Sequence, residues 1–235
     1  MTENEFKDYL DTLKSELNGQ LNEVKEKKLK ALTSVLSVKD YEQILSILKA
    51  DDVLSVQEYE MLKKNYMVSN KYLMFYGIGS RIFGEIWAIQ QLKSLDSRFK
   101  EPNMTLDPLY CGEYDLLFEG VKIGAKACRA ISVNEEGDRF AKAMHYDPKK
   151  FFAMHFRQVR IESYDILVLI GVWMDQLVYW VLPYVEMKEN KYFVKYEGEI
   201  EEVLLVINDK NISDFEKFRV AESKVADVIL SKKVR

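Results

Sequence analysis

Apolar side chains recur every three or four positions through the first 95 residues, and no proline precedes Pro102, so this part of the chain is predicted to be helical. Four helices are expected. A turn at 51–55 separates the second from the third, and a glycine-containing break at 77–80 separates the third from the fourth. Ser37 and Asp40 suit the start of the second helix. The first helix carries one apolar stripe, too short to predict a coiled coil, formed by Phe6, Leu10, Leu13, Leu17, Leu21 and Val24.

After Pro102 the pattern changes to that of β-strands. Glu119-Gly120 lies between two short apolar runs and predicts the tight turn of a β-hairpin. The run from Tyr164 to Trp173 is apolar and rich in β-branched residues, as expected for a strand buried on both faces. The predicted strands are 113–118, 121–128, 164–173, 176–185, 191–196 and 202–207.

Two helices are expected among these strands. Asp147 as N-cap and Pro148 at the first helical position predict a helix through 149–156. Ser213 is the expected N-cap of a closing helix at 214–231. The order of elements predicts an α/β or α+β fold with a mixed central β-sheet flanked by helices.

The length of 235 residues accommodates one large domain with a helical subdomain, which we place at 1–68, before a second region at 69–235. With 48% hydrophobic and 31% charged residues the chain has enough apolar material for a core, which excludes intrinsic disorder. The longest apolar runs fall short of the roughly 18 residues of a membrane span. The N-terminus lacks the pattern of a secretion signal, and two cysteines provide neither a disulfide framework nor a zinc site. We therefore expect a soluble, cytoplasmic protein without a membrane partner.

The charge is unevenly distributed. The chain has a formal net charge of −4, but the segment 122–160 holds nine Lys/Arg and four Asp/Glu, a net charge of +5, which leaves −9 for the rest. A basic segment on an acidic protein suits a cleft for a polyanion. An ordinary solvated face is the alternative, and the composition leaves both open.

The predicted hairpin brings together side chains that could carry chemistry. Asp115 lies on its first strand, and Gly124 and Lys126 lie two positions apart on the second, so their side-chain positions share a face. Asp115 and Lys126 can therefore converge at one end of the sheet. A lysine in an apolar strand needs an acidic or phosphate partner when it is partly buried. Glu85 lies beside the apolar face of the fourth predicted helix.

These residues resemble the PD-(D/E)XK nuclease superfamily, the fold of many type II restriction endonucleases. The resemblance lies in an acid on one strand, a turn, and then Gly124-Ala125-Lys126 in place of acid-x-Lys. It extends to the helix carrying Glu85, and to a helix and buried strands expected after the motif, and covers roughly 70–220. It implies a Mg²⁺ site made by Asp115 and the backbone carbonyl of Ala125, with Asp115, Lys126 and Glu85 as catalytic residues.

The sequence departs from the family pattern at two positions. Tyr114 precedes Asp115 where the pattern has proline, and Gly124 replaces the second acid. Three explanations are open for Gly124: the acid is supplied from elsewhere, the substitution inactivates the site, or the resemblance is accidental. The alternative sources of the acid are Glu85, Glu135 and Glu136.

The resemblance implies a Mg²⁺-dependent, sequence-specific endonuclease for double-stranded DNA that acts as a homodimer. The N-terminal helices would then serve dimerisation or embrace the DNA. Two rivals are a catalytically silent DNA-binding protein of the same fold and a helical protein-interaction module. The expected contacts to phosphates or bases are Arg129, Arg139, Lys142, Lys149, Lys150, Arg157, Gln158 and Arg160.

Overall fold

The computed structural model describes residues 3–32, 38–79, 82–139, 141–195 and 202–232. Its contacts divide the chain into two compact units. Unit 1 comprises Met1–Lys71 and Glu136–Lys142, and unit 2 comprises Tyr72–Glu135 and Ala143–Arg235. In the described part of the chain, unit 1 is helical and unit 2 is a mixed α/β structure with two sheets.

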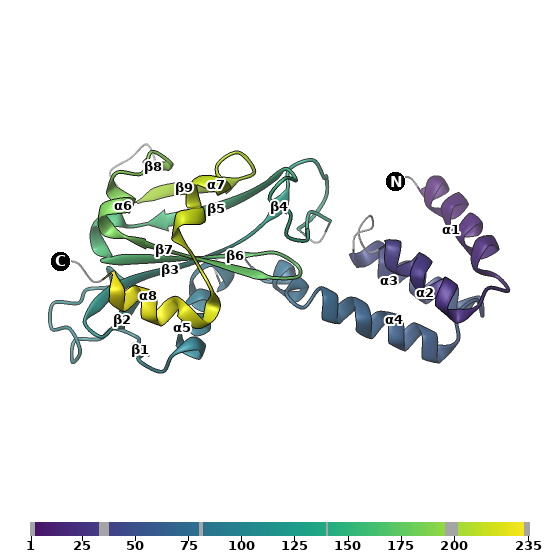
Figure 1. Ribbon diagram of the computed structural model, residues 1–235, viewed down its shortest axis with the longest axis horizontal. Coiled ribbons are helices and arrows are strands. Elements are labelled where there is room, and N and C mark those ends of the chain that lie inside the picture. The colour runs from purple at the N-terminus through teal and green to yellow at the C-terminus, as the bar shows by residue number, and fades with distance from the viewer. Residues whose placement is uncertain (1–2, 33–37, 80–81, 140, 196–201, 233–235) are drawn as a thin grey trace. The chain divides into compact units, whose positions relative to one another are not determined.

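Unit 1 is built from four helices, drawn in purple and blue in Figure 1. The stripe predicted to run through one helix to Val24 is interrupted, because the first helix ends at Leu17 and Gly19 adopts a φ of +73° that ends the helical path. Leu10, Leu13 and Leu17 are buried as predicted, whereas Leu21 is 78% exposed. The helices are α1 (Glu3–Leu17), α2 (Asn22–Leu32), α3 (Val38–Ala50) and α4 (Val56–Ser69).

The turn predicted at 51–55 is confirmed, and it ends in a capping box. The Ser55 hydroxyl accepts from the Glu58 backbone N–H at 3.2 Å, and the Glu58 carboxylate accepts from the Ser55 N–H at 2.7 Å. Ser37 and the side chain of Asp40, predicted to begin the preceding helix, lie outside the described residues.

A mixed six-stranded sheet, sheet A, forms the centre of unit 2 (Figure 1). β3 and β6 are parallel, and the other neighbours in the sheet are antiparallel. The predicted mixed sheet flanked by helices is confirmed at this level. In spatial order the strands are β1 (Phe99–Lys100), β2 (Leu116–Phe118), β3 (Val121–Arg129), β6 (Ile166–Val172), β7 (Leu177–Pro183) and β10 (Arg219–Val220).

A second, antiparallel sheet, sheet B, belongs to the same unit, and its presence was not predicted. Two of its strands coincide with those expected at 191–196 and 202–207. In spatial order the strands are β4 (Ile131–Ser132), β5 (Phe152–Val159), β9 (Val203–Asn208) and β8 (Phe193–Lys195).

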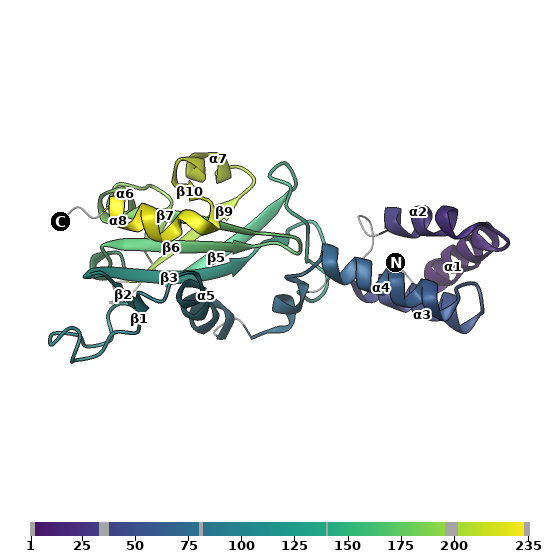
Figure 2. The same ribbon diagram turned by 60° about the horizontal axis from the view of Figure 1, so that its bottom comes forward.

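Sheet A separates two hydrophobic cores. Figure 2 shows its strands and the helices around them from a second direction. On one face it packs against η2 (Ile82–Trp87), α5 (Ala88–Leu95) and α8 (Val225–Ser231). On the other it packs against sheet B, α6 (Tyr184–Lys188) and α7 (Ile212–Phe215). The side chains of β6 alternate between the two cores, which explains why this strand is apolar throughout and confirms that it is buried on both faces.

The helix predicted at 149–156 is wrong, because this segment forms β5. The Asp147 carboxylate accepts from the Lys149 N–H at 2.9 Å, only two residues on, so it closes a turn rather than capping a helix. Phe152, Met154 and Phe156 then alternate into the core between the sheets, and β5 pairs with β9. This long-range pairing outweighs the local helix-start signal.

The closing helix predicted at 214–231 is also wrong as one continuous element. Arg219 pairs with Trp180 in β7, so a short strand, β10, interrupts the helical path between α7 and α8. Ser213 is not an N-cap, because it lies inside α7, whose N-cap position is Asn211.

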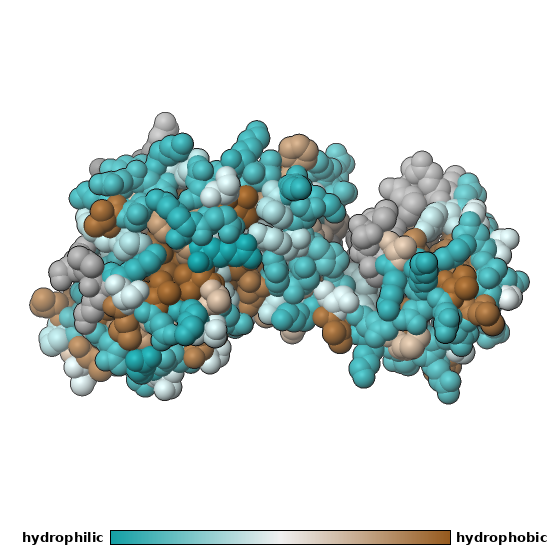
Figure 3. All heavy atoms as spheres, viewed as in Figure 1, coloured by the Kyte–Doolittle hydropathy of each residue, from teal (hydrophilic) through white to brown (hydrophobic). Residues whose placement is uncertain are grey.

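The exterior of each unit is mostly hydrophilic on the face shown in Figure 3, with apolar residues in scattered groups. Among the described residues, every helix is too short or too polar to traverse a lipid bilayer. The apolar residues of the sequence thus supply mainly the two cores of unit 2 and the core of unit 1.

Candidate active site

The helix carrying Glu85 begins as a single stretch of π-helix, η2, and continues as α5. Phe83 is 1% exposed and belongs to the core below sheet A, and a Cβ at Gly84 would lie only 3.5 Å from the carbonyl of Ala127. The helix therefore approaches β3 closely at this point and places Glu85 beside it. The predicted fourth helix is confirmed, although its Ile82 and Ile86 are more than half exposed instead of buried.

The predicted hairpin is confirmed, with Glu119 and Gly120 at φ values of 50° and 80°. Positive φ at both central positions is typical of a type I′ turn, which matches the twist of the strands. Directly before β2, the Asp115 N–H donates to the Ile123 carbonyl at 3.0 Å, and the Asp115 carboxylate accepts from the Ala125 N–H at 2.7 Å. The Asp115 carboxylate thus accepts the hydrogen bond of a β3 backbone N–H at a position where β2 no longer pairs with β3.

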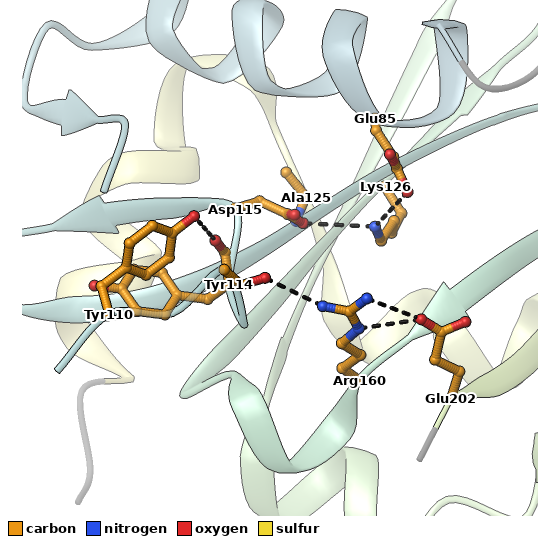
Figure 4. Close-up of polar contacts among 9 residues, drawn as sticks. Glu85, Tyr110, Tyr114, Asp115, Ala125, Lys126, Arg160 and Glu202 are labelled. Atoms are coloured by element: carbon orange, nitrogen blue, oxygen red, sulfur yellow. Dashed lines mark hydrogen bonds and ion pairs between the residues drawn. The ribbon is translucent and has the colours of Figure 1, made fainter. Parts of the chain in front are cut away.

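Lys126 lies between two carboxylates (Figure 4). Its ammonium nitrogen is 3.3 Å from Glu85 Oε1 and 3.7 Å from Asp115 Oδ2. The Lys126 side chain is only 7% exposed, whereas those of Asp115 and Glu85 are 20% and 37% exposed. The predicted convergence of Asp115 and Lys126 is therefore present, and Glu85 joins them from η2. The two acids are the partners that a buried ammonium group requires.

Asp115 has a perturbed acidity. Burial raises the pKa of its carboxyl group, while the Lys126 charge and the Ala125 N–H lower this pKa and the charge of Glu85 raises it. The effect of burial is the largest, so the pKa is above its ordinary value. A carboxyl group whose pKa is shifted by burial and by a specific charged partner is a candidate for a functional site.

The chain before Asp115 is fixed by aromatic residues. Tyr114 is buried, and its hydroxyl donates to the Asp107 carboxylate at 2.9 Å. Lys122 on β3 pairs with the same carboxylate at 3.1 Å, and the Tyr110 ring packs edge-on against that of Tyr114. Tyr114 stands where the family pattern has proline, and it anchors this segment through side-chain contacts.

Tyr164 is a residue of this site that the sequence did not reveal. A Cβ at Gly124 would lie 2.4–2.7 Å from ring atoms of Tyr164, a residue only 1% exposed, so the ring covers the glycine. Burial raises the pKa of Tyr164, and the charges of Asp115 and Glu85 raise it further. A glycine inside an apolar strand signals such a close approach, but not which residue makes it.

Three oxygen ligands that could hold a divalent ion lie at this site: the carboxylates of Asp115 and Glu85 and the carbonyl of Ala125. In β-strands the N–H and C=O of one residue point to the same side, so the Ala125 carbonyl faces the side on which its N–H meets Asp115. Two carboxylates and a carbonyl suit Mg²⁺, which usually retains waters and binds substrate phosphate. The described residues contain no group of three or more His, Cys, Asp or Glu arranged to hold a metal. Any metal here would depend on Asp115, Glu85 and Ala125.

Of the three candidate sources of a second acid, the structure brings Glu85 to Lys126. Glu135 and Glu136 are exposed and follow β4 in the chain, and Glu136 begins the segment that belongs to unit 1.

Arg129 does not fit the predicted role in DNA binding. It is 7% exposed, its guanidinium donates to the carbonyls of Phe75 and Ile78 at 2.6 Å each, and it stacks over the Phe83 ring at 4.0 Å. These contacts attach β3 to the segment that leads into η2. Arg129 therefore supports the position of Glu85 from inside the fold.

Arg160 is also engaged by the protein itself. Its guanidinium donates to Glu202 Oε1 at 3.1 and 3.0 Å and to the Gly112 carbonyl at 3.1 Å (Figure 4). The hydrogen bond to Gly112 makes Arg160 a tether for the loop before Asp115, and its charge lowers the pKa of Asp115. Glu202, its partner, was not among the predicted residues.

The remaining predicted DNA contacts lie on exposed segments. Lys149 and Lys150 precede β5, and Arg157 and Gln158 lie on it, with Gln158 at a φ of 56° where the pairing with β9 shifts register. Arg139 and Lys142 belong to unit 1. Lys149, Lys150, Arg157 and Gln158 thus share unit 2 with the Asp115–Lys126 site and, like Arg160, are exposed on it.

Comparisons with protein-family models, curated proteins and solved structures found no match for this chain. The resemblance to PD-(D/E)XK nucleases therefore depends on the residues and geometry of the hairpin. One departure concerns the connection from β3 to its parallel neighbour β6, where a helix was expected and β4 and β5 are found.

Proposed function

We propose that this protein is a Mg²⁺-dependent endonuclease that hydrolyses phosphodiester bonds in double-stranded DNA at specific sites, in the manner of type II restriction enzymes. The observation that carries this proposal is the nearly buried Lys126 held between Asp115 and Glu85 where β2 and β3 diverge. Burying three charged groups costs desolvation free energy, and here burial has raised the pKa of Asp115.

Each residue has a defined task in this proposal. Mg²⁺, when bound, would lower the pKa of a water molecule and neutralise charge on the scissile phosphate. Asp115, Glu85 and the Ala125 carbonyl would hold the ion. Lys126 would orient the attacking water and stabilise negative charge as the new P–O bond forms and the bond to the leaving oxygen breaks. The Ala125 N–H keeps Asp115 oriented through its 2.7 Å hydrogen bond.

The test is digestion of plasmid and genomic DNA with Mg²⁺ by the unmodified protein, Asp115→Asn and Glu85→Gln. We expect discrete fragments from the unmodified protein and a loss of at least about 100-fold in rate for each variant. Asp227→Asn and Glu162→Gln are matched controls, because these carboxylates are 63% and 60% exposed and pair with other surface residues. Equal rates in all five proteins would contradict the proposal.

A second candidate function is DNA binding without cleavage. It is favoured by Gly124, which supplies no carboxylate, and by the limited set of metal-binding side chains among the described residues. It predicts that the protein retains duplex DNA at low salt and releases it as salt rises, with no fragments in Mg²⁺ or Mn²⁺. Absence of any salt-dependent affinity would exclude both functions.

Palindromic sites favour a two-fold symmetric enzyme, so we propose a homodimer on DNA. Light scattering of the protein with a duplex containing the site should give the mass of two chains on one duplex. The mass of one chain per duplex would contradict this part of the proposal.

A further inference from the structure

Position 124 is closed to any side chain in the folded protein. An ideal Cβ there would lie 2.4, 2.5 and 2.7 Å from three atoms of the Tyr164 ring, distances that real Cβ atoms essentially never show. The ring is 1% exposed and belongs to the core between the two sheets. It therefore has little room to move aside.

The residues around this contact keep both partners in place. Gly124 lies opposite Leu167 in the parallel pairing of β3 with β6, so its backbone is fixed on that side. Asp165, next to Tyr164, accepts from the Lys122 N–H at 2.8 Å and donates its own N–H to the Lys122 carbonyl at 2.8 Å. Tyr164 thus enters β6 from a segment that is attached to β3 two residues before Gly124.

We infer that Gly124 and Tyr164 are a packed pair, and that Tyr164 is a positioning residue whose ring occupies the space that an acid at position 124 would need. The glycine is then native to this site rather than the remnant of a lost acid. The second carboxylate is Glu85, which reaches Lys126 from η2 at 3.3 Å. The part of this inference that concerns a metal rests on the proposed function, whereas the packing of the pair does not.

A double-mutant cycle tests the packing. Gly124→Asp should lower the urea midpoint of unfolding by roughly 1 M, because overpacking a core is destabilising. In the Tyr164→Ala background the same substitution should cost less than half of this shift, since the ring is gone. In the Tyr164→Phe background the full shift should persist, because the ring remains. Gly79→Asp, at a position with no atom within 4 Å of a Cβ, is the control and should change the midpoint little.

Metal binding provides a readout that does not depend on cleavage. We expect calorimetry with Mn²⁺ to show at least roughly tenfold tighter binding by Gly124→Asp/Tyr164→Ala than by the unmodified protein, because the new carboxylate joins Asp115 and Glu85. Glu85→Gln should weaken Mn²⁺ binding by a similar factor, whereas the control Glu162→Gln should not.

The outcomes separate this inference from the proposed function. If Gly124→Asp keeps its urea midpoint, or if the cycle is additive, position 124 is open and the inference is wrong. If Gly124→Asp alone tightens Mn²⁺ binding or produces cleavage, the glycine is a lost acid and the inference is again wrong. If the cycle shows coupling but no variant binds Mn²⁺ or cuts DNA, the packed pair stands and the proposed function fails.

Discussion

The raised pKa of Asp115 has a consequence for stability that follows from its sign. A folded-state pKa above the unfolded value means that the folded protein holds the proton more tightly. The stabilising contribution of the protonated group is full below the unfolded value of about 3.9 and is lost as pH rises through the folded pKa. In its ionised form Asp115 is therefore a cost to folding relative to its protonated form.

Asp115→Asn removes this cost. We expect the free energy of unfolding of the variant to rise relative to that of the unmodified protein between pH 4 and 7, with a slope of at most about 1.4 kcal/mol per pH unit. Urea unfolding at four or five pH values measures it, with Asp227→Asn on α8 as the exposed control. A difference that shrinks as pH rises would show that the fold stabilises the Asp115 carboxylate.

Removing the charge of Lys126 should lower the free energy of unfolding, since this charge lies between two acids. Lys126→Met keeps most of the volume but leaves Asp115 and Glu85 without the cation. We expect a loss of about 1–3 kcal/mol in the free energy of unfolding at pH 7, recovered in acid where the carboxylates become neutral. Lys224→Met, at a side chain 65% exposed, should change it by less than about 0.5 kcal/mol. A fully stable Lys126→Met protein would mean that the ion pairs contribute nothing to folding.

How far the site could be predicted depended on distance along the chain. Asp115 and Lys126 are joined by one hairpin, so the period of two and a strong turn signal were enough to place them together. Glu85 required the further assumption that a helix lies on β3. Tyr164 is 40 residues from Gly124, and nothing in the local pattern links them, so this contact became visible only in three dimensions.

At the scale of elements, the turn of the hairpin determines how well the site is held. Glu119 adopts a φ of 50°, which a glutamate tolerates less readily than an asparagine does. We expect Glu119→Asn to raise the free energy of unfolding by a few tenths to about 1 kcal/mol, and Gly120→Ala, at a φ of 80°, to lower it by about 1 kcal/mol. Thermal and urea unfolding measure both. A less stable Glu119→Asn protein together with a more stable Gly120→Ala protein would contradict a type I′ turn at this position.

The elements that were predicted correctly have one dominant sequence pattern. The elements that were predicted wrongly have two patterns that favour different secondary structures. β6 and β7 are long apolar runs, and their assignment needed no knowledge of their neighbours. The segment 149–156 combines an Asp-Pro helix start with apolar residues that fit either period, and its pairing with β9 decides in favour of a strand. The last segment is divided because Arg219 and Val220 complete the edge of sheet A.

At the scale of the whole molecule, the basic segment 122–160 is divided between the two units, and two of its arginines are engaged by other residues of unit 2. Arg129 is buried, Arg160 is neutralised by Glu202, and Arg139 and Lys142 belong to unit 1. Within unit 2, the exposed basic residues among the predicted contacts are Lys149, Lys150, Arg157 and Arg160, of which Arg160 is paired with Glu202. Under the proposed function, a net charge of −4 would repel DNA, so binding by unit 2 would depend on these few exposed basic residues.

Few phosphate contacts predict a shallow salt dependence. We expect the logarithm of the association constant for a labelled duplex to fall with the logarithm of salt concentration, with a slope that each of Lys149→Ala, Lys150→Ala and Arg157→Ala reduces by about 0.9. Fluorescence anisotropy between 25 and 200 mM KCl measures the slopes, with Lys217→Ala as a control at a lysine paired with Glu186. If the three variants keep the full slope while the affinity remains salt-dependent, the phosphates are held elsewhere, and the basic residues of unit 1 become the next to test. If the unmodified protein shows no slope at all, the charge around the site serves the fold alone, because a protein that neutralises DNA phosphates must release counterions.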